Sequence, residues 1–286
     1  MKWSQRRAQA RAVLEGSACI HPASVHDPVS ARIAEDLGFE LGMFAGSTGS
    51  LAILGAPDLI MITLTEFAEQ ALRINRAAAR LPLVVDADHG YGNALNVMRT
   101  VEELEVAGVA AMSIEDTDLP RPFGAPKPRL IPLEEGVGKM RAAVAARVDP
   151  ALIILARTGA MSITGLDDCI ARVRAYNTTG ADGIFLTGVT TRAQLDAVAT
   201  EAKLPLVLGT LTPEIADRDY LASRGVRIAL QGHLPFQAAI AAIHATLKAL
   251  REGTPPEAIS GTAPAALARA VMREEGYAKV TRDFLD

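Results

Sequence analysis

Two aspartates stand one residue apart in the stretch VVDADHGYGN, residues 84–93, directly after a short apolar run. Such a run is typical of a buried strand, where an unpaired carboxylate costs several kcal/mol or loses its charge. Because side chains alternate along an extended chain, Asp86 and Asp88 are expected to point the same way. Glu115 ends the next apolar run at a similar depth. These carboxylates would repel one another unless a cation joined them.

A set of oxygen ligands without Cys suits Mg²⁺ or Mn²⁺ better than Zn²⁺. We therefore predict a metal site formed by Asp86, Asp88 and Glu115. The alternative is that the acids cap helices or pair with lysines. His89 stands beside two carboxylates and could simply hydrogen-bond to one of them.

Other polar residues stand at the ends of further apolar runs. Arg157 follows LIILA and could pair with a substrate carboxylate, or with Glu115 or Asp116 in a structural ion pair. His233, in QGHLPF, could act on a substrate or be a loop residue without a role. Ser47 lies in FAGSTGS, whose small residues could bring backbone N–H groups to an anion or form a plain turn.

Eight short apolar runs alternate with segments of helical periodicity. The runs are ACIHP (18–22), ELGMF (40–44), LVVDA (83–87), GVAAMSI (108–114), LIILA (152–156), GIFLT (183–187), LPLVL (204–208) and VRIAL (226–230). Helices are expected at 65–80, 96–107, 132–147, 165–176, 191–203 and 235–251. The alternation predicts parallel βαβ units, and it favours a closed (β/α)8 TIM-type barrel over a doubly wound open sheet. In a barrel the polar residues above would meet at the C-terminal strand ends.

The chain continues beyond the eighth repeat. The segment EGTPPEAISGTAP (252–264) breaks the pattern, and a final helical stretch at 265–275 needs something to pack against. We expect residues 1–251 to form the catalytic barrel and residues 252–286 to form a C-terminal helical arm of the same domain.

Composition and charge exclude several classes of protein. The chain has 286 residues, of which 22% are charged, and a net charge of −4. It has no basic run of the kind that follows phosphates, so no nucleic-acid partner is expected. No apolar stretch approaches the roughly 18 residues of a membrane span, and the charged start lacks a signal-peptide core. Cys19 and Cys169 are isolated and expected to be reduced. These features predict a soluble cytoplasmic protein without a membrane partner.

The motifs together resemble those of the phosphoenolpyruvate mutase/isocitrate lyase superfamily. DADHGYGN (86–93), SIEDT (113–117), ARTGA (156–160) and GS (46–47) occur in that order, in a likeness that runs from about Ala10 to Arg251. Within the superfamily the chain is most similar to the oxaloacetate decarboxylase branch. That likeness is carried by ASV with DP (23–28), by DADHGYGNALNVMRT (86–100) and by GH (232–233).

The resemblance implies roles for the metal ligands. Asp86 would hold Mg²⁺, or Mn²⁺ in its place, and Asp88 and Glu115 would contact it directly or through water. Asp58 would join through a further water.

The resemblance also implies how substrate and subunits are bound. Ser47 and Arg157 would grip the carboxylate end of a small α-keto acid, and His233 would contact the substrate, so that Arg157 and His233 are the catalytic residues. The arm would pack its helix on a neighbouring subunit, which gives a homo-oligomer, a dimer or a tetramer.

The loop after the fourth run departs from the family pattern. Carbon–carbon lyases of the superfamily carry K-K-C-G-H there, and its mutases and phosphonopyruvate hydrolases carry an Asn in K-x-N-S. Here the loop is TDLPRPFGAPKPRL (117–130), without Cys, His or Asn. A site that chelates an α-keto acid on Mg²⁺ and stabilises an enolate remains. This predicts Mg²⁺-dependent decarboxylation of oxaloacetate to pyruvate and CO₂ through a metal-stabilised enolpyruvate.

Two rival interpretations stay open. One is a lyase that cleaves a C–C bond of a 2-hydroxy dicarboxylate or tricarboxylate, of the methylisocitrate or 2,3-dimethylmalate type, with another proton donor. The other is a non-catalytic barrel that binds a dicarboxylate as a sensor. A binding protein would be expected to lose some of Asp86, Asp88, Glu115 and Arg157, so their presence together favours an enzyme.

Overall fold

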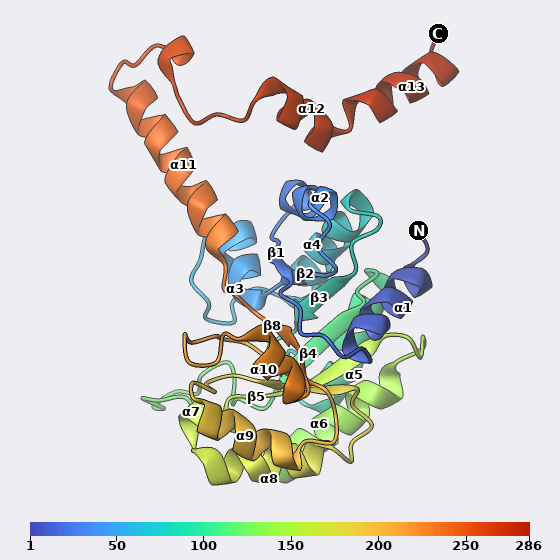
Figure 1. The fold of residues 1–286 in the computed structure, drawn as a ribbon, viewed down its shortest axis with the longest axis vertical. Helices are drawn as coiled ribbons and strands as arrows, with labels where there is room; N and C mark the ends of the chain where they lie inside the picture. Colours follow the sequence, from blue (N-terminus) through green and yellow to red (C-terminus); the bar gives the residue numbers. More distant parts are fainter.

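Eight parallel strands follow one another around a single sheet in a computed structural model that describes residues 1–286 (Figure 1). The strands are β1 (Ala23–Ser24), β2 (Gly42–Phe44), β3 (Leu83–Asp86), β4 (Ala111–Glu115), β5 (Ile153–Thr158), β6 (Gly183–Leu186), β7 (Leu206–Leu208) and β8 (Val226–Ala229). Ile20 joins the two edges: its N–H donates to the carbonyl of Arg227 at 2.9 Å, and its own carbonyl accepts from the N–H of Ala229 at 3.0 Å. The predicted (β/α)8 barrel is confirmed.

The first strand differs from its predicted position at 18–22. Only Ile20 of that run forms a bridge, and the regular strand begins at Ala23. Pro22 lies between them and has no N–H to donate to a strand ladder. The first strand of the barrel therefore consists of two short pieces, the bridge at Ile20 and the regular strand Ala23–Ser24.

Helices surround the sheet. They are α2 (Pro28–Asp36), α4 (Leu64–Ala77), α5 (Ala94–Val106), α6 (Leu133–Ala146), α8 (Leu166–Tyr176), α9 (Arg192–Glu201) and α10 (Arg218–Ser223), with the short α3 (Gly46–Gly49), η1 (Ser50–Leu54) and α7 (Ala160–Ile163) after β2 and β5. Several begin at a polar cap; the side chain of Asn93, for example, accepts from the N–H groups of Leu95 and Asn96 and so starts α5 beside the acidic motif.

Two apolar clusters separate the inside of the barrel from its outer wall. On β3, Val84 belongs to the interior cluster, whereas Leu83 and Val85 belong to the larger cluster between sheet and helices. The helix α1 (Trp3–Leu14) covers one end of the interior with Ala10 and Leu14. Arginines of α1 donate to carbonyls that precede β4 and β5, so this is the N-terminal end of the barrel. The opposite, C-terminal end is left for the polar residues.

The segment after β8 leads away from the barrel (Figure 1). It contains α11 (Leu234–Arg251), η2 (Pro256–Ala258), α12 (Ala265–Met272) and α13 (Glu274–Phe284). The single helical stretch predicted at 265–275 is divided at Arg273, whose backbone is left-handed (φ 62°). Arg273 pairs with Asp36 at 2.6 Å, and Arg32 donates to the carbonyl of Val271 at 3.0 Å, so α12 rests on α2 of its own chain. No side chain of α11 or α13 is buried.

None of these helices is both long and apolar enough to cross a membrane.

Candidate active site

Side chains of three neighbouring strands point into the C-terminal mouth of the barrel. On β3 and β5, the interior residues Val84 and Leu155 precede Asp86 and Arg157 by two positions, so the charged residues face inward as well. The same alternation on β4 turns Glu115 inward. All three charged groups stand at or next to the C-terminal ends of their strands, where barrel enzymes have their active sites.

Arg157 joins the two acids. Its Nη1 contacts Asp86 Oδ2, and its Nη2 lies 3.6 Å from Glu115 Oε2. The hydroxyl of Ser113 donates to Asp86 Oδ1 at 2.9 Å, and that of Thr117 donates to Glu115 Oε2 at 2.9 Å. The mouth thus holds a charged and hydrogen-bonded network of β3, β4 and β5, and Arg157 does form an ion pair with Glu115, as one alternative predicted.

Asp116 belongs to a different network. Its Oδ2 accepts hydrogen bonds from Arg172 at 2.9 Å and from the hydroxyl of Tyr176 at 2.7 Å, both on α8. The alternative pairing of Arg157 with Asp116 is therefore wrong, because the next residue after Glu115 points into the barrel wall.

The position of Asp88 in the mouth does not follow from the alternation of side chains along a strand. β3 ends at Asp86, and Asp88 has a left-handed backbone (φ 47°), so the expectation of an extended chain from Asp86 to Asp88 was wrong. Its carboxylate turns toward the end of β2 instead: a methyl group added at Gly46 would lie 2.5 Å from Asp88 Oδ1. Asp88 is 4% exposed, and its Oδ2 has no hydrogen-bond partner.

His233 stands at the N-cap of α11 and is held by β1. Its Nδ1 lies 2.8 Å from the hydroxyl of Ser24. Partial burial lowers the pKa of His233, while the carboxylates of Asp86 and Asp58 act in the opposite direction. The ring is therefore mainly neutral at pH 7, and it shares the mouth with the acids.

Two further predicted residues lie near this network. Ser47, partly buried, follows Gly46 in the first turn of α3 and so lies next to the residue that Asp88 faces. His89 is buried, and its Nδ1 has no hydrogen-bond partner. This atom therefore does not form the predicted hydrogen bond to a carboxylate. Burial and Lys139 lower the pKa of His89 to about 4.

Sequence reasoning gave no role to Ser24 or Ser113. Ser113 could have been found, because it lies two residues before Glu115 and so faces the interior too. The contact between Ser24 and His233 joins residues 209 positions apart. It depends on closure of the barrel, which no local pattern encodes.

The acids carry more negative charge than the arginine balances. Burial and the carboxylates of Asp86 and Glu115 raise the pKa of Asp88 well above its usual range. Burial also raises the pKa of Glu115, although Arg157 acts against it. Burial acts to lower the pKa of Arg157, but Asp86 and Glu115 outweigh it and raise that pKa. A further positive charge would stabilise the ionised form of all three acids.

The chemistry of these donors fits a hard divalent cation. They are carboxylate oxygens without sulfur, and Asp88 offers a buried oxygen that has no partner. As the side chains stand, however, no group of three or more Asp, Glu, His or Cys residues is gathered closely enough to hold an ion. In this arrangement Arg157 contacts Asp86 Oδ2, and the Asp88 carboxylate is turned toward Gly46. The metal ligands Asp86, Asp88 and Glu115 stay a prediction.

The chain is similar to known proteins over nearly its whole length. The family model of phosphoenolpyruvate phosphomutase matches residues 11–251. An oxaloacetate decarboxylase of Bradyrhizobium sp. (strain ORS 278) is 59% identical to the chain, over 100% of this chain and 99% of its own.

Solved structures share the whole fold. Oxaloacetate acetylhydrolase in complex with 3,3-difluorooxalacetate has a TM-score of 0.86 and 30% identity, over 98% of this chain and 97% of its own. Phosphonopyruvate hydrolase in complex with oxalate and Mg²⁺ has a TM-score of 0.86 and 28% identity, over 98% and 99% of the two chains.

Proposed function

The chain belongs to the phosphoenolpyruvate phosphomutase family, part of the phosphoenolpyruvate mutase/isocitrate lyase superfamily, and we propose that it decarboxylates oxaloacetate to pyruvate and CO₂. The observation that carries this proposal is the 59% identity, over the full chain, to a relative named oxaloacetate decarboxylase. The charged network in the mouth of the barrel supports it, because oxaloacetate is a small dianion with a keto group that must be bound and polarised.

Arg157 is the group best placed to bind a substrate carboxylate. It is fixed by Asp86 and Glu115, and a guanidinium offers two parallel N–H donors to a carboxylate. Ser47, beside Gly46 at the end of β2, would add a hydroxyl to the same carboxylate. This pair would hold C1 of the α-keto acid and leave the far carboxylate, on C4, toward the rim.

His233 would face the carboxylate that leaves. If the hydroxyl of Ser24 donates to Nδ1, the neutral ring keeps its proton on Nε2 and can donate there. A neutral donor orients the C4 carboxylate without holding it as tightly as a cation would. When the C3–C4 bond breaks, CO₂ departs, and the electron pair moves through C3 onto the C2 oxygen as an enolate that is later protonated at C3.

A divalent cation held by Asp86, Asp88 and Glu115, Mg²⁺ or Mn²⁺, would supply Lewis-acid stabilisation of that developing negative charge. Donor stabilisation of an oxyanion is commonly worth about 3–4 kcal/mol. The side chains of Arg157 and Ser47 would contribute by binding the substrate, and Asp86 and Glu115 by fixing the guanidinium of Arg157.

The loop of residues 117–130 separates this proposal from the lyase alternative. A lyase on a 2-hydroxy acid must deprotonate a hydroxyl and protonate a departing carbanion, and this loop contains no Cys or His. The distinguishing experiment is incubation with Mg²⁺ and a panel of 2-keto and 2-hydroxy acids, namely oxaloacetate, methylisocitrate and 2,3-dimethylmalate, with assays for pyruvate and CO₂. Release from oxaloacetate alone supports the decarboxylase.

The exposed apolar side chains of α11 support the proposal that the chain forms a homo-oligomer. The helix carries Ile240, Ile243, Leu247 and Leu250, all exposed. A helix with this much apolar surface and no buried side chain is expected to be covered by another surface. We therefore propose that α11 packs on a second copy of the chain.

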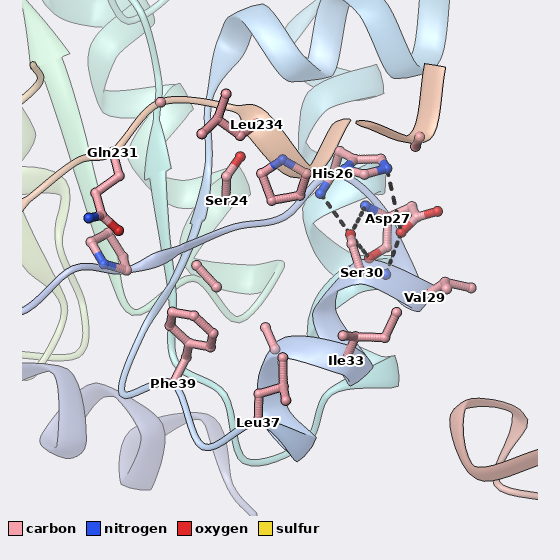
Figure 2. Close-up of a pocket in the computed structure, with 16 residues that line it drawn as sticks. Ser24, His26, Asp27, Val29, Ser30, Ile33, Leu37, Phe39, Gln231 and Leu234 are labelled. Carbon is pink, nitrogen blue, oxygen red and sulfur yellow. Dashed lines mark hydrogen bonds and ion pairs between the residues drawn. The ribbon is translucent and has the colours of Figure 1, made fainter. Parts of the chain in front are cut away.

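The groove in Figure 2 is the surface proposed to receive it. It has a volume of about 570 Å³ and lies between α2 and the start of α11, with Ile33, Leu37 and Phe39 on one side and Leu234 on the other. Leu37 and Leu234 are 70% and 66% exposed. Exchange of α11 between two copies would cover both apolar surfaces at once, which is a common route to dimers and higher assemblies.

A further inference from the structure

The turn that presents Asp88 has an unusual backbone. Asp88 and Tyr91 have positive φ angles of 47° and 59°, and Gly90 and Gly92 have 76° and 148°. Left-handed backbone is uncommon for residues other than glycine. Each such residue costs about 1–3 kcal/mol and persists only where the surroundings hold it. This turn therefore needs external support.

Three carbonyl groups of the turn are held from three different elements. The carbonyl of Asp88 accepts from the N–H of Glu115 on β4 at 2.7 Å. The carbonyl of Gly90 accepts from the hydroxyl of Thr100 on α5 at 3.0 Å. Between them, the carbonyl of His89 accepts from Nζ of Lys139 on α6.

Lys139 is the charged member of this set, and its environment is unusual for a lysine. It is 3% exposed and forms no ion pair; its one hydrogen bond goes to the His89 carbonyl. Lysine is almost never fully buried unless it is paired, because an ammonium loses its hydration there. Burial lowers the pKa of Lys139, and Glu135 and Glu115 act against this shift. Its positive charge thus acts on Glu115 and lies beside the turn that carries Asp88.

We propose that Lys139 is a positioning residue for the acidic site: its hydrogen bond fixes the His89 carbonyl, so that the backbone of Asp88 stays left-handed and its carboxylate stays in the mouth. The inference rests on the proposed function, in which Asp88 is a metal ligand. Partners that orient metal ligands commonly change metal affinity by about 10–100-fold when they are removed.

The test is the affinity of the protein for Mn²⁺ alone, without substrate, measured by electron paramagnetic resonance. Lys139→Met keeps an unbranched side chain one atom shorter and removes its donor and charge. We expect it to bind Mn²⁺ at least about tenfold more weakly than the unmodified chain. Thr100→Val is the matched control, because it removes a neutral hydrogen bond from the same turn, and less than about a threefold loss is expected there.

A second readout distinguishes positioning from a general loss of structure. Excess Mg²⁺ should return kcat of Lys139→Met toward the value of the unmodified enzyme, while the Mg²⁺ concentration for half-maximal activity rises by about tenfold. A merely structural role would lower the melting temperature and leave this concentration unchanged. If Lys139→Met does not fold, Lys139→Leu, which also removes both the donor and the charge, decides with the same expectation.

The inference is overturned if the folded variant binds Mn²⁺ as the unmodified chain does, or if Lys139→Met and Thr100→Val lose equal affinity. Absence of Mn²⁺ and Mg²⁺ binding by the unmodified chain would be a different result. It would remove the proposed metal site itself, and the role of Lys139 with it.

Discussion

Glu115 and Arg157 stand opposite each other in the register of β4 and β5, and the guanidinium that lies 3.6 Å from Glu115 also contacts Asp86. One arginine is therefore shared by two buried carboxylates, with Asp88 as a third close by. Burial raises the pKa values of Asp88 and Glu115, and neighbouring carboxylates add to this, so a further positive charge would stabilise their ionised forms. A divalent cation would supply this charge.

Removal of the metal should abolish activity. Asp86→Ala takes away a proposed ligand at a strand end and should reduce pyruvate release from oxaloacetate to the rate of Mg²⁺ alone, with an unchanged circular dichroism spectrum. A chelator should do the same, and Mg²⁺ or Mn²⁺ should restore the rate. Asp196→Ala, at an exposed ion pair with Arg224, is the control and should stay active. Full activity of Asp86→Ala, or in chelator, would contradict the metal site.

Substitution of His233 should lower kcat/KM for oxaloacetate more than substitution of Ser24. His233→Ala removes the proposed donor and should lower kcat/KM by roughly 10²-fold or more. Ser24→Ala removes only the hydroxyl 2.8 Å from Nδ1 and should lower it by about three- to tenfold, because the ring is less well oriented. Steady-state kinetics with oxaloacetate measures both. A larger loss in Ser24→Ala than in His233→Ala would contradict this order.

Protonation of His89 should destabilise the fold in acid. Burial lowers its pKa to about 4, below the ordinary value of 6.5, so the unfolded chain binds the proton more readily. Stability from this group is complete above pH 6.5 and is lost as the pH falls toward 4. Each unit of pKa difference is worth about 1.4 kcal/mol, so the loss amounts to a few kcal/mol.

Urea unfolding of the intact chain and of His89→Gln between pH 4.5 and 7.5 isolates this effect. Raised pKa values at Asp88 and Glu115 act with the opposite sign, since they favour the folded state at lower pH, but they are common to both proteins. The stability of His89→Gln should therefore fall less steeply below pH 6.5. Parallel curves for the two proteins would exclude His89 as the cause.

Charge on the apolar face of α11 should separate the subunits. Ile243→Glu together with Leu247→Glu places carboxylates where we propose contact with a second copy, so multi-angle light scattering should give a monomer where the unmodified chain gives a dimer or tetramer. Ala245→Glu, at an exposed position on the opposite side of the same helix, is the control and should keep the assembly. A monomer for the unmodified chain at micromolar concentration would contradict the proposal.

The sequence predicted the barrel well and the finer geometry of the site less well. Apolar runs located seven of the eight strands, because these strands are largely buried on both faces, but they placed the first strand too early in the chain. Caps and periodicity predicted α4, α5, α6, α8, α9 and α11, but not α1, α2 or α10. Alternation also turned Asp86, Glu115 and Arg157 inward. It failed at Asp88, where a left-handed residue follows the strand end, and at Ser24, whose partner His233 depends on closure of the ring. The final segment was expected to hold one helical stretch at 265–275, but it holds two helices, divided at Arg273, which forms ion pairs with Glu35 and Asp36 of α2.

The most direct test of the account is the kcat/KM of the purified chain for oxaloacetate with saturating Mg²⁺, followed by pyruvate formation and compared with Mg²⁺ alone. We expect release of pyruvate and CO₂ well above the metal-only rate, competitive inhibition by oxalate, and a loss of at least about 10²-fold in Arg157→Gln. The same substitution at the exposed Arg174 should have no effect. No decarboxylation above the rate of Mg²⁺ alone, together with clear cleavage of methylisocitrate or 2,3-dimethylmalate, would contradict the account.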